Sequence, residues 1–267
     1  MNCFICNQAA DLYCTVGDKE ISQCKNCGLG ITGDLFSQVG DYHRDETYIN
    51  EPELFKNIFQ KRVKIISDFK KSGKVLEIGC SIGVMLQLLQ DRGFTVYGVE
   101  MSAGAAKIAA GKGLKVIVDK FENIKFKDNF DIIILNHTLE HLENPRRIIK
   151  KCFSLLNKGG IIYIDVPNFG SWSARKQGYR WSLLLPEEHL WHFTYFSLEI
   201  LLREFKFKII YSERASGIFD LDNPFKELIF ALIHFKKRFF SELVTLFPSL
   251  IISKLNLGTD LMIIAQK

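Results

Sequence analysis

The amino-acid sequence predicts an α/β fold built on a doubly wound parallel sheet, with a small amino-terminal module and a late helical insertion. Three observations support this prediction. Short apolar segments alternate with helical patterns between residues 74 and 166, and the first of them runs into a glycine turn. Four cysteines in two close pairs precede this region. Alternation of strands and helices with right-handed crossovers produces a parallel sheet.

Length and composition allow one large domain, or one domain with a small module. The 267 residues are 47% hydrophobic, which supports a sizeable core, and the net charge of +5 is too mild to require a nucleic-acid partner. We expect neither a signal peptide nor a transmembrane helix, because no basic segment precedes an apolar core and no long uncharged apolar run occurs. Cysteines without a secretory signal indicate reduced thiols and a cytoplasmic chain.

The cysteines at the start of the chain have the spacing of a metal site. Four of them form two C-x-x-C pairs: Cys3, Cys6, Cys24 and Cys27. Two such turns place four thiolates tetrahedrally around zinc, and four thiolates close its coordination shell. We therefore expect residues 1–40 to form a zinc ribbon with a structural Zn²⁺, because so short a segment needs a metal to fold. Cys14 is left over, and Cys152 is interpreted as a packing residue.

Residues 41–73 connect this module to the sheet. Their polar first part, which includes Tyr42, His43 and Tyr48, has the composition of a surface linker. In Pro52–Lys71 the apolar residues recur at helical spacing, and a proline suits the first turn of a helix. We expect this helix to pack beside the sheet.

The segment Lys74–Gly83, KVLEIGCSIG, is an apolar strand that runs into a glycine turn, and a helical pattern follows at once. A strand, a glycine turn and a helix start together present backbone N–H groups to a ligand. Gly79 and Gly83 allow conformations or close approaches that a side chain forbids. A second apolar strand, Thr95–Val99, ends at Glu100, whose carboxylate suits a ribose diol.

These motifs resemble class I S-adenosylmethionine-dependent methyltransferases. VLEIGCSIG is similar to their first motif, YGVE to their second-strand motif and NHTLEHLENP to the segment after their fourth strand. The resemblance covers about Lys74–Val166 and implies a Rossmann-like sheet of seven strands, with S-adenosyl-L-methionine as cofactor. It also implies that the tyrosine-rich stretch at residues 42–48 folds over the cofactor or acceptor, as an alternative to a linker.

The other elements follow from the same alternation. We expect helices over Ala103–Ala110, with Ser102 as N-cap, over Pro145–Leu156 and over Ser197–Phe205. The remaining strands are expected at Leu114–Val118, Phe130–Leu135, Gly160–Val166, Phe207–Tyr211 and Leu261–Ala265. Residues 74–267 would form the methyltransferase domain, interrupted by an insertion at 212–257. Ligands of such sheets bind at the carboxyl ends of the strands.

The resemblance implies a cofactor role for the residues that follow the strands. Glu77, Gly79 and Gly83 would hold the methionine end, Glu100 the ribose and Asp119 the adenine. Glu122, or Lys120 and Phe121, would compete with Asp119 for the adenine. The further cofactor-binding candidates are Cys80, which we also interpret as a packing residue, Met101, Asn136 and His137.

One histidine pair resembles a metal site by its spacing. His137 and His141 are four residues apart, and Glu140 lies between them. The H-E-x-x-H order is absent, and methyl transfer from a sulfonium needs no metal. We therefore interpret Glu140 and His141 as a capping and packing cluster.

The segment Pro167–Tyr195 has the composition of an acceptor pocket. It is rich in aromatic residues and contains His189 and His192, either of which would serve as the base for a hydroxyl acceptor. The segment resembles that of methyltransferases of polysaccharide and lipid-linked glycan synthesis, although Glu187 and Glu188 separate the proline from the first histidine. The alternative is that His192 simply packs under a lid.

The insertion contains a wide apolar face with lysines and one arginine around it, most of it within residues 222–253. Pro248 should kink or end its second helix. Aromatic and leucine residues flanked by lysines fit a helical hairpin in a membrane interface, a lid over the acceptor or a dimer contact. Peripheral attachment at the inner face of the membrane would place the site beside a lipid-linked acceptor.

The sequence thus predicts a zinc-ribbon methyltransferase that acts on a small or lipid-linked acceptor, most simply a sugar hydroxyl. One alternative is an rRNA base methyltransferase, against which stand the mild charge and the apolar insertion. A second alternative is a non-catalytic methyltransferase fold that acts as a binding or scaffold protein, against which stands the intact glycine turn.

Overall fold

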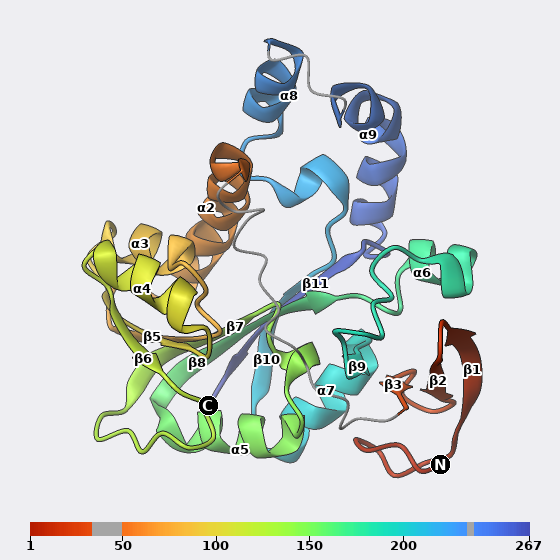
Figure 1. Ribbon diagram of the computed structural model, residues 1–267, viewed down its shortest axis with the longest axis horizontal. Helices are drawn as coiled ribbons and strands as arrows, with labels where there is room; N and C mark the ends of the chain where they lie inside the picture. The colour runs from red at the N-terminus through yellow and green to blue at the C-terminus, as the bar shows by residue number, and fades with distance from the viewer. Residues whose placement is uncertain (34–49, 234–237) are drawn as a thin grey trace.

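The computed structural model describes residues 1–33, 50–233 and 238–267 (Figure 1). The predicted linker residues Tyr42, His43 and Tyr48 lie outside the described residues, as do Lys236 and Lys237 of the insertion. The described part contains a seven-stranded sheet, a four-stranded sheet and a pair of projecting helices.

The seven-stranded sheet confirms the predicted fold class. Its order is β10-β11-β8-β7-β4-β5-β6. The strands are β4 Lys74–Ile78, β5 Thr95–Glu100, β6 Lys115–Val118, β7 Phe130–Asn136, β8 Leu156–Pro167, β10 Lys208–Glu213 and β11 Asp260–Gln266. The five strands from β6 to β8 are parallel, whereas β11 runs antiparallel to both of its neighbours. The sheet is therefore mixed at one edge, because β11 returns from the insertion and inserts between β8 and β10.

Helices cover both faces of this sheet, as the nearly continuous apolar runs of its central strands require. On one face α2 Pro52–Phe69 and α3 Val84–Gln90 pack over Ile132 and Ile134. On the other face α5 Pro145–Leu155 and α7 Tyr195–Glu204 pack over the alternate residues of β7. Helix α4 Ala103–Gly111 begins at Ser102, whose side chain accepts from the N–H of Ala105, so the predicted N-cap is present.

The cysteine-rich module forms the second sheet, and the main chain completes it. Strands β1 Ala10–Val16, β2 Lys19–Cys24 and β3 Gly30–Thr32 are antiparallel, and the short strand β9 Trp191–His192 pairs with β3. Figure 1 shows this sheet beside α6 Trp172–Gln177 and α7. The segment that carries the predicted acceptor residues therefore contributes one strand, β9, to the sheet of the module.

The insertion consists of the short turn η3 Gly217–Asp220 and the helices α8 Pro224–Ile233 and α9 Arg238–Lys254, which project from the sheet in Figure 1. Helix α9 continues past Pro248 rather than ending there. Within the described ranges, neither these helices nor the others are long and apolar enough to cross a membrane. Large apolar side chains are nevertheless exposed here, among them Phe225 (77%), Val244 (76%) and Phe247 (70%).

Candidate functional site

The glycine turn after β4 forms the floor of the candidate site. Gly79, Ser81 and Gly83 have left-handed backbones, with φ of 73°, 46° and 76°. The N–H of Gly79 donates to the carbonyl oxygen of Val99 at 2.8 Å, which holds the turn against the end of β5. Glycine adopts such conformations without strain. The turn thus lies at the carboxyl edge of the sheet, where ligands of this architecture bind.

Packing as well as backbone conformation requires the two glycines. A Cβ atom on Gly79 would lie 2.6 Å from Thr138 Oγ1, and one on Gly83 would lie 2.4 Å from Leu114 Cδ1. The hydroxyl of Thr138 donates to the carbonyl oxygen of Ile78 at 3.0 Å, so its position is fixed by β4 itself. The turn therefore has no space for a side chain at either position.

Glu100 supports the turn from its side. Its Oε2 accepts the N–H of Ser81 at 2.8 Å, and its Oε1 accepts the N–H of Ser102 at 2.9 Å. A carboxylate offers about four acceptor positions, so about two are left for hydroxyl groups of a ligand. This geometry is compatible with the predicted ribose contact, which stays a prediction.

A hollow of about 270 Å³, part of it open to solvent, lies over the turn. Its lining residues are Phe59, Glu77, Gly79, Cys80, Ser81, Ile82, Val84, Met85 and Asn136. In the described part of the chain, the buried Glu77 Oε2 and Asn136 Oδ1 have no hydrogen-bond partner. Burial, and then the charge of Glu100, raises the pKa of Glu77 well above 4.5. Unsatisfied buried oxygens in a hollow indicate a ligand that brings hydrogen-bond donors.

The hollow brings together part of the predicted cofactor set. Glu77, Gly79, Cys80 and Asn136 all line it, and burial raises the pKa of the Cys80 thiol, as expected for a packing residue. Met101 is exposed just beyond β5. The predicted methionine-end contacts are therefore adjacent to one another in space.

The predicted adenine contacts lie beyond β6, outside the lining of the hollow. Asp119 is exposed, and its Oδ1 accepts the N–H of Lys120 at 2.6 Å and the amide of Asn123 at 3.0 Å. Phe121 is buried, with the Lys151 ammonium 4.5 Å from its ring centre. The Phe121 ring is therefore occupied by protein contacts, and Asp119 stays the predicted contact.

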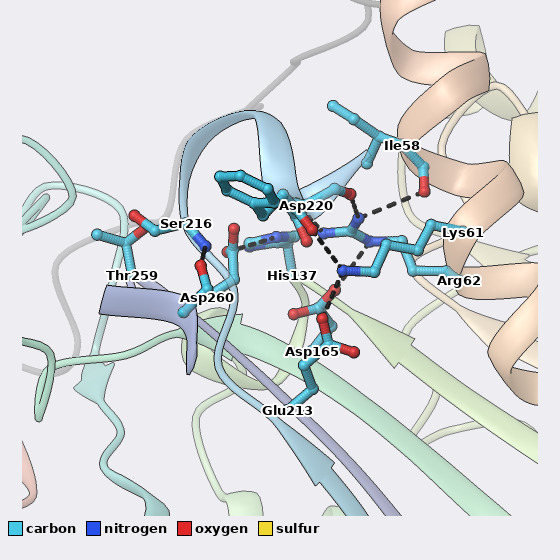
Figure 2. Close-up of polar contacts among 12 residues, drawn as sticks. Ile58, Lys61, Arg62, His137, Asp165, Glu213, Ser216, Asp220, Thr259 and Asp260 are labelled. Carbon is cyan, nitrogen blue, oxygen red and sulfur yellow. Dashed lines mark hydrogen bonds and ion pairs between the residues drawn. The ribbon is translucent and has the colours of Figure 1, made fainter. Parts of the chain in front are cut away.

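A buried polar network lies at the carboxyl end of β8 and the amino end of the antiparallel β11 (Figure 2). Arg62 extends from α2 into this network. Its Nε donates to Asp165 at 2.9 Å, and its Nη2 donates to Asp220 at 2.8 Å. Its Nη1 also donates to the carbonyl oxygens of Asp220 and Ile58. The network joins the amino-terminal helix, the sheet and the insertion, because each supplies one member.

His137 borders this network and follows directly after Asn136. Its backbone is left-handed, with φ of 47°, an uncommon conformation for a non-glycine residue. Its Nδ1 lies 3.5 Å from Glu140 Oε1, and its Nε2 lies 3.6 Å from Asp260 Oδ1. Burial acts to lower the pKa of His137, but the contact with Glu140 and the charges of Asp165 and Asp260 outweigh it and raise the pKa to about 9.

The predicted bases His189 and His192 are both buried, with exposures of 1% and 3%. His192 contacts Thr32 of β3, with 3.1 Å between Nε2 and Oγ1, and burial followed by the charge of His189 lowers its pKa to about 3. The ring of His189 lies 4.8 Å from that of His141, centre to centre. Neither histidine lines the hollow. The structure thus places them behind the site, against the cysteine-rich module and the η1 turn Leu139–His141.

The four predicted cysteine ligands do come together. The Sγ atoms of Cys3 and Cys27 are 3.6 Å apart, those of Cys6 and Cys24 are 3.4 Å apart, and all four lie within 4.8 Å of one another. Tetrahedral zinc with Zn–S bonds of about 2.3 Å needs Sγ–Sγ separations of this order. The contact between the two thiols lowers the pKa of Cys3 and raises that of Cys27, as expected where two thiols share one proton. The donor set therefore fits Zn²⁺.

Sequence reasoning missed Phe59, Arg62, Asp165 and Asp260. A signal existed for two of them. Arg62 interrupts the apolar face of the α2 pattern, and Asp165 interrupts the apolar run GIIYIDV. A charge at a buried position needs a partner, so both positions indicate a polar contact across the core.

Comparison with known sequences agrees with this geometry. A family model described as a methyltransferase domain matches residues 51–212. An uncharacterised protein of Methanocaldococcus jannaschii is 34% identical over 122 residues, which cover 45% of this chain and 56% of that protein. A ubiquinone biosynthesis O-methyltransferase of Glaesserella parasuis is 32% identical over 107 residues, 36% of this chain and 45% of that protein. The chain spans about half the length of the curated relatives it matches.

Comparison with solved structures concerns the fold. The crystal structure of an S-adenosylmethionine-dependent methyltransferase from Archaeoglobus fulgidus aligns with a TM-score of 0.57 and 21% identity. The alignment covers 84% of this chain and all of that chain. At this identity the likeness shows a common fold.

Proposed function

The chain belongs to the methyltransferase domain family, and on this basis we propose that it transfers the methyl group of S-adenosylmethionine to a small-molecule acceptor. The observation that carries the proposal is the hollow over the glycine turn, with two unsatisfied buried oxygens beside it. S-adenosylmethionine supplies a methyl group on a positively charged sulfonium, together with an ammonium and hydroxyl groups that donate hydrogen bonds. The carboxylates of Glu77 and Glu100 complement that chemistry.

We assign the predicted roles to the residues around the hollow. Glu77 and Asn136 would accept hydrogen bonds from the methionine end, and Glu100 would accept the ribose hydroxyls with its remaining lone pairs. Asp119 and Met101 would border the adenine. Because the sulfonium already activates the methyl group, the task of the protein is to align the acceptor and exclude water.

The acceptor we propose is a hydroxyl group. The relative from Glaesserella parasuis is by name an O-methyltransferase, and the segment 167–195 resembles that of enzymes of glycan synthesis. Because His189 and His192 are buried away from the hollow, we propose Asp260, whose Oδ1 lies 3.6 Å from His137 Nε2, as the proton acceptor in their place. Burial, with the charges of neighbouring aspartates, raises the pKa of Asp260 to about 8, and a base works best with a pKa near the working pH.

A lipid-linked acceptor is the finer form of this proposal. The exposed apolar residues of α8 and α9 would lie in a membrane interface, at the inner face of the membrane for a cytoplasmic protein. The exposed Lys226 and Lys254 at the ends of this pair would face anionic headgroups. Replacing Phe225 and Phe247 by glutamate should abolish flotation with anionic liposomes, whereas Lys107→Glu on the distant α4 should not. Equal recovery of all three proteins in the soluble fraction would contradict the membrane contact.

We further propose that the ribbon, residues 1–40, holds a structural Zn²⁺ through Cys3, Cys6, Cys24 and Cys27. Four thiolates leave no open coordination position, so the ion would stabilise rather than react. The hydroxyl of Thr194 donates to the carbonyl oxygen of the ligand Cys27 at 2.6 Å. The turn that contains Cys27 would therefore support the start of α7. Through the pairing of β3 with β9, it would also support the segment that carries His189 and His192.

A transfer assay tests the proposal. S-adenosylmethionine with a labelled methyl group would be incubated with the protein and, separately, with a lipid extract, a small-molecule extract and total RNA of the source cells. We expect label in the lipid or small-molecule fraction, and none with Gly83→Ala. Label confined to RNA would favour the rRNA alternative, and absence of label from every fraction would favour a scaffold.

A further inference from the structure

A cluster of possible metal ligands lies behind the hollow, separate from the four cysteines. Glu140 and His141 come from the η1 turn, and His189 comes from the loop before β9. One ligand atom from each lies within 4.8 Å of the others. The cluster joins two segments that are distant in the sequence, and the N–H of Leu190 donates to the carbonyl oxygen of Glu140 at 2.9 Å to hold them together.

Glu140 is the unusual member of this cluster. Its side chain is 1% exposed, and both carboxylate oxygens are buried without a hydrogen-bond partner in the described residues. Its nearest contacts with imidazole nitrogens are long: 3.5 Å to His137 Nδ1 and 4.0 Å to His141 Nε2. A buried carboxylate normally has hydrogen-bond donors or a metal as its partner. The orientation of Glu140 therefore indicates a ligand between it and the imidazoles.

His141 is oriented as a metal ligand would be. Its Nδ1 lies 2.8 Å from the carbonyl oxygen of Glu188. A carbonyl can only accept, so Nδ1 donates its hydrogen to Glu188, and Nε2 is the ring nitrogen on the side of Glu140. A second nitrogen bonded to a backbone carbonyl is the usual support of a histidine that binds a metal.

The neighbouring cluster of His137, Asp165 and Asp260 differs in this respect. Arg62 already neutralises Asp165 at 2.9 Å, so that cluster contains its own cation. Glu140 has no arginine or lysine among its ion-pair contacts in the described ranges.

We propose that Glu140, His141 and His189 bind a divalent transition metal ion, at a second site distinct from the cysteine ribbon. Two imidazole nitrogens and one carboxylate oxygen suit Zn²⁺, Co²⁺ or Fe²⁺ better than Mg²⁺ or Ca²⁺. Metal–ligand bonds of about 2.0–2.2 Å require the three side chains to move closer to one another than they are here. The ion would fasten the loop before β9 to the η1 turn, beside His137.

Cobalt titration of the metal-free protein tests this site independently of methyl transfer. Co²⁺ bound by thiolates gives intense near-ultraviolet charge-transfer absorption, which counts the ribbon ion, and equilibrium dialysis counts the total. We expect the total to exceed the thiolate-bound amount by about one equivalent in the wild type. The isosteric Glu140→Gln variant should lose that excess and keep the thiolate absorption.

His192→Asn provides the matched control, because it alters a buried histidine of the same loop that is outside the cluster. It should retain the excess equivalent, and His189→Asn should lose it. Thermal melting followed by circular dichroism would verify that each variant is folded. No excess metal in the wild type, or the same excess in Glu140→Gln, would overturn the proposal.

Discussion

Single residues determine the shape of the glycine turn, and Gly83 allows this to be measured. Gly83→Ala should lower the free energy of unfolding by about 1–2 kcal/mol for the left-handed backbone and by about 1–3 kcal/mol more for the collision with Leu114. Gly93→Ala is the control, because its φ is 87° and no atom lies within 4 Å of the added Cβ. Chemical denaturation of both variants gives the difference. Equal losses would show that Leu114 moves away without cost.

Binding of the cofactor should be coupled to the release of a proton from the carboxyl group of Glu77. Its pKa is raised by burial and by the charge of Glu100, so the folded protein holds this proton more tightly than the unfolded chain. Its contribution to stability is therefore greatest below pH 4.5 and decreases as the pH rises toward the folded pKa. A sulfonium in the hollow would favour the ionised carboxylate and release the proton.

Calorimetry in two buffers of different ionisation enthalpy measures that release. S-adenosylmethionine should release protons and bind more tightly as the pH rises, whereas the demethylated product, which has no sulfonium charge, should release fewer. Glu77→Gln should remove the difference between the two ligands. The same proton release for both ligands would place the sulfonium away from Glu77.

Local motifs made part of the site predictable from the sequence. Glu77, Gly79, Gly83 and Glu100 lie at fixed distances along a strand, a turn and the next strand, so their spacing alone indicates a common edge of the sheet. Arg62 is different, because its partners come from β8 and from η3. Nothing in the sequence near Arg62 specifies those partners, and the same holds for the approach of His189 to Glu140.

At the scale of elements, the ribbon and the loop before β9 form one structural unit. The backbone of Thr32 pairs with Leu190, its hydroxyl donates to the carbonyl oxygen of His189 at 2.7 Å, and Trp191 packs on Phe4 with ring centres 4.9 Å apart. Gly30 has no space for a Cβ, which would lie 2.8 Å from His192 Cβ. Order in the loop therefore depends on order in the ribbon.

Removal of the ribbon metal should thus be detected far along the chain. We expect hydrogen exchange to accelerate in residues 24–32 and also in residues 189–194, because β3 and β9 share their hydrogen bonds. Residues 74–100, which contain the glycine turn, should exchange as before. Acceleration confined to residues 1–33 would show that the loop is ordered without the ribbon.

The sequence predicted most of these elements, because buried parallel strands read as apolar runs and the helices have periodic apolar faces. All seven strands of the main sheet are present where expected. The pairing of β9 with β3 was not predictable, because two residues carry no strand pattern and their partner is about 160 residues away. The strand β11 was predicted, but its antiparallel direction was not, because that direction depends on the path of the insertion.

At the scale of the whole molecule, Arg62 is the contact that unites the amino-terminal helix, the sheet and the insertion. Arg62→Met should cost about 3–5 kcal/mol of unfolding free energy, because it leaves the carboxylates of Asp165 and Asp220 buried without their cation. Lys64 lies on the same helix as Arg62 and forms an exposed ion pair with Asp222. Lys64→Ala should therefore cost only about 0–1 kcal/mol of unfolding free energy. Similar losses for both would show that the buried network contributes little.

The central claim is that the hollow over the glycine turn binds S-adenosylmethionine. The most direct test is calorimetric titration of the wild type, of Glu100→Ala and of a control, Glu143→Ala. The side chain of Glu143 is 64% exposed. The account predicts binding by the wild type and by Glu143→Ala, and a loss of about 1.5–3 kcal/mol, or about 10- to 150-fold in affinity, for each charged hydrogen bond that Glu100→Ala removes. Absence of binding to the wild type, or equal affinity for all three proteins, would contradict it.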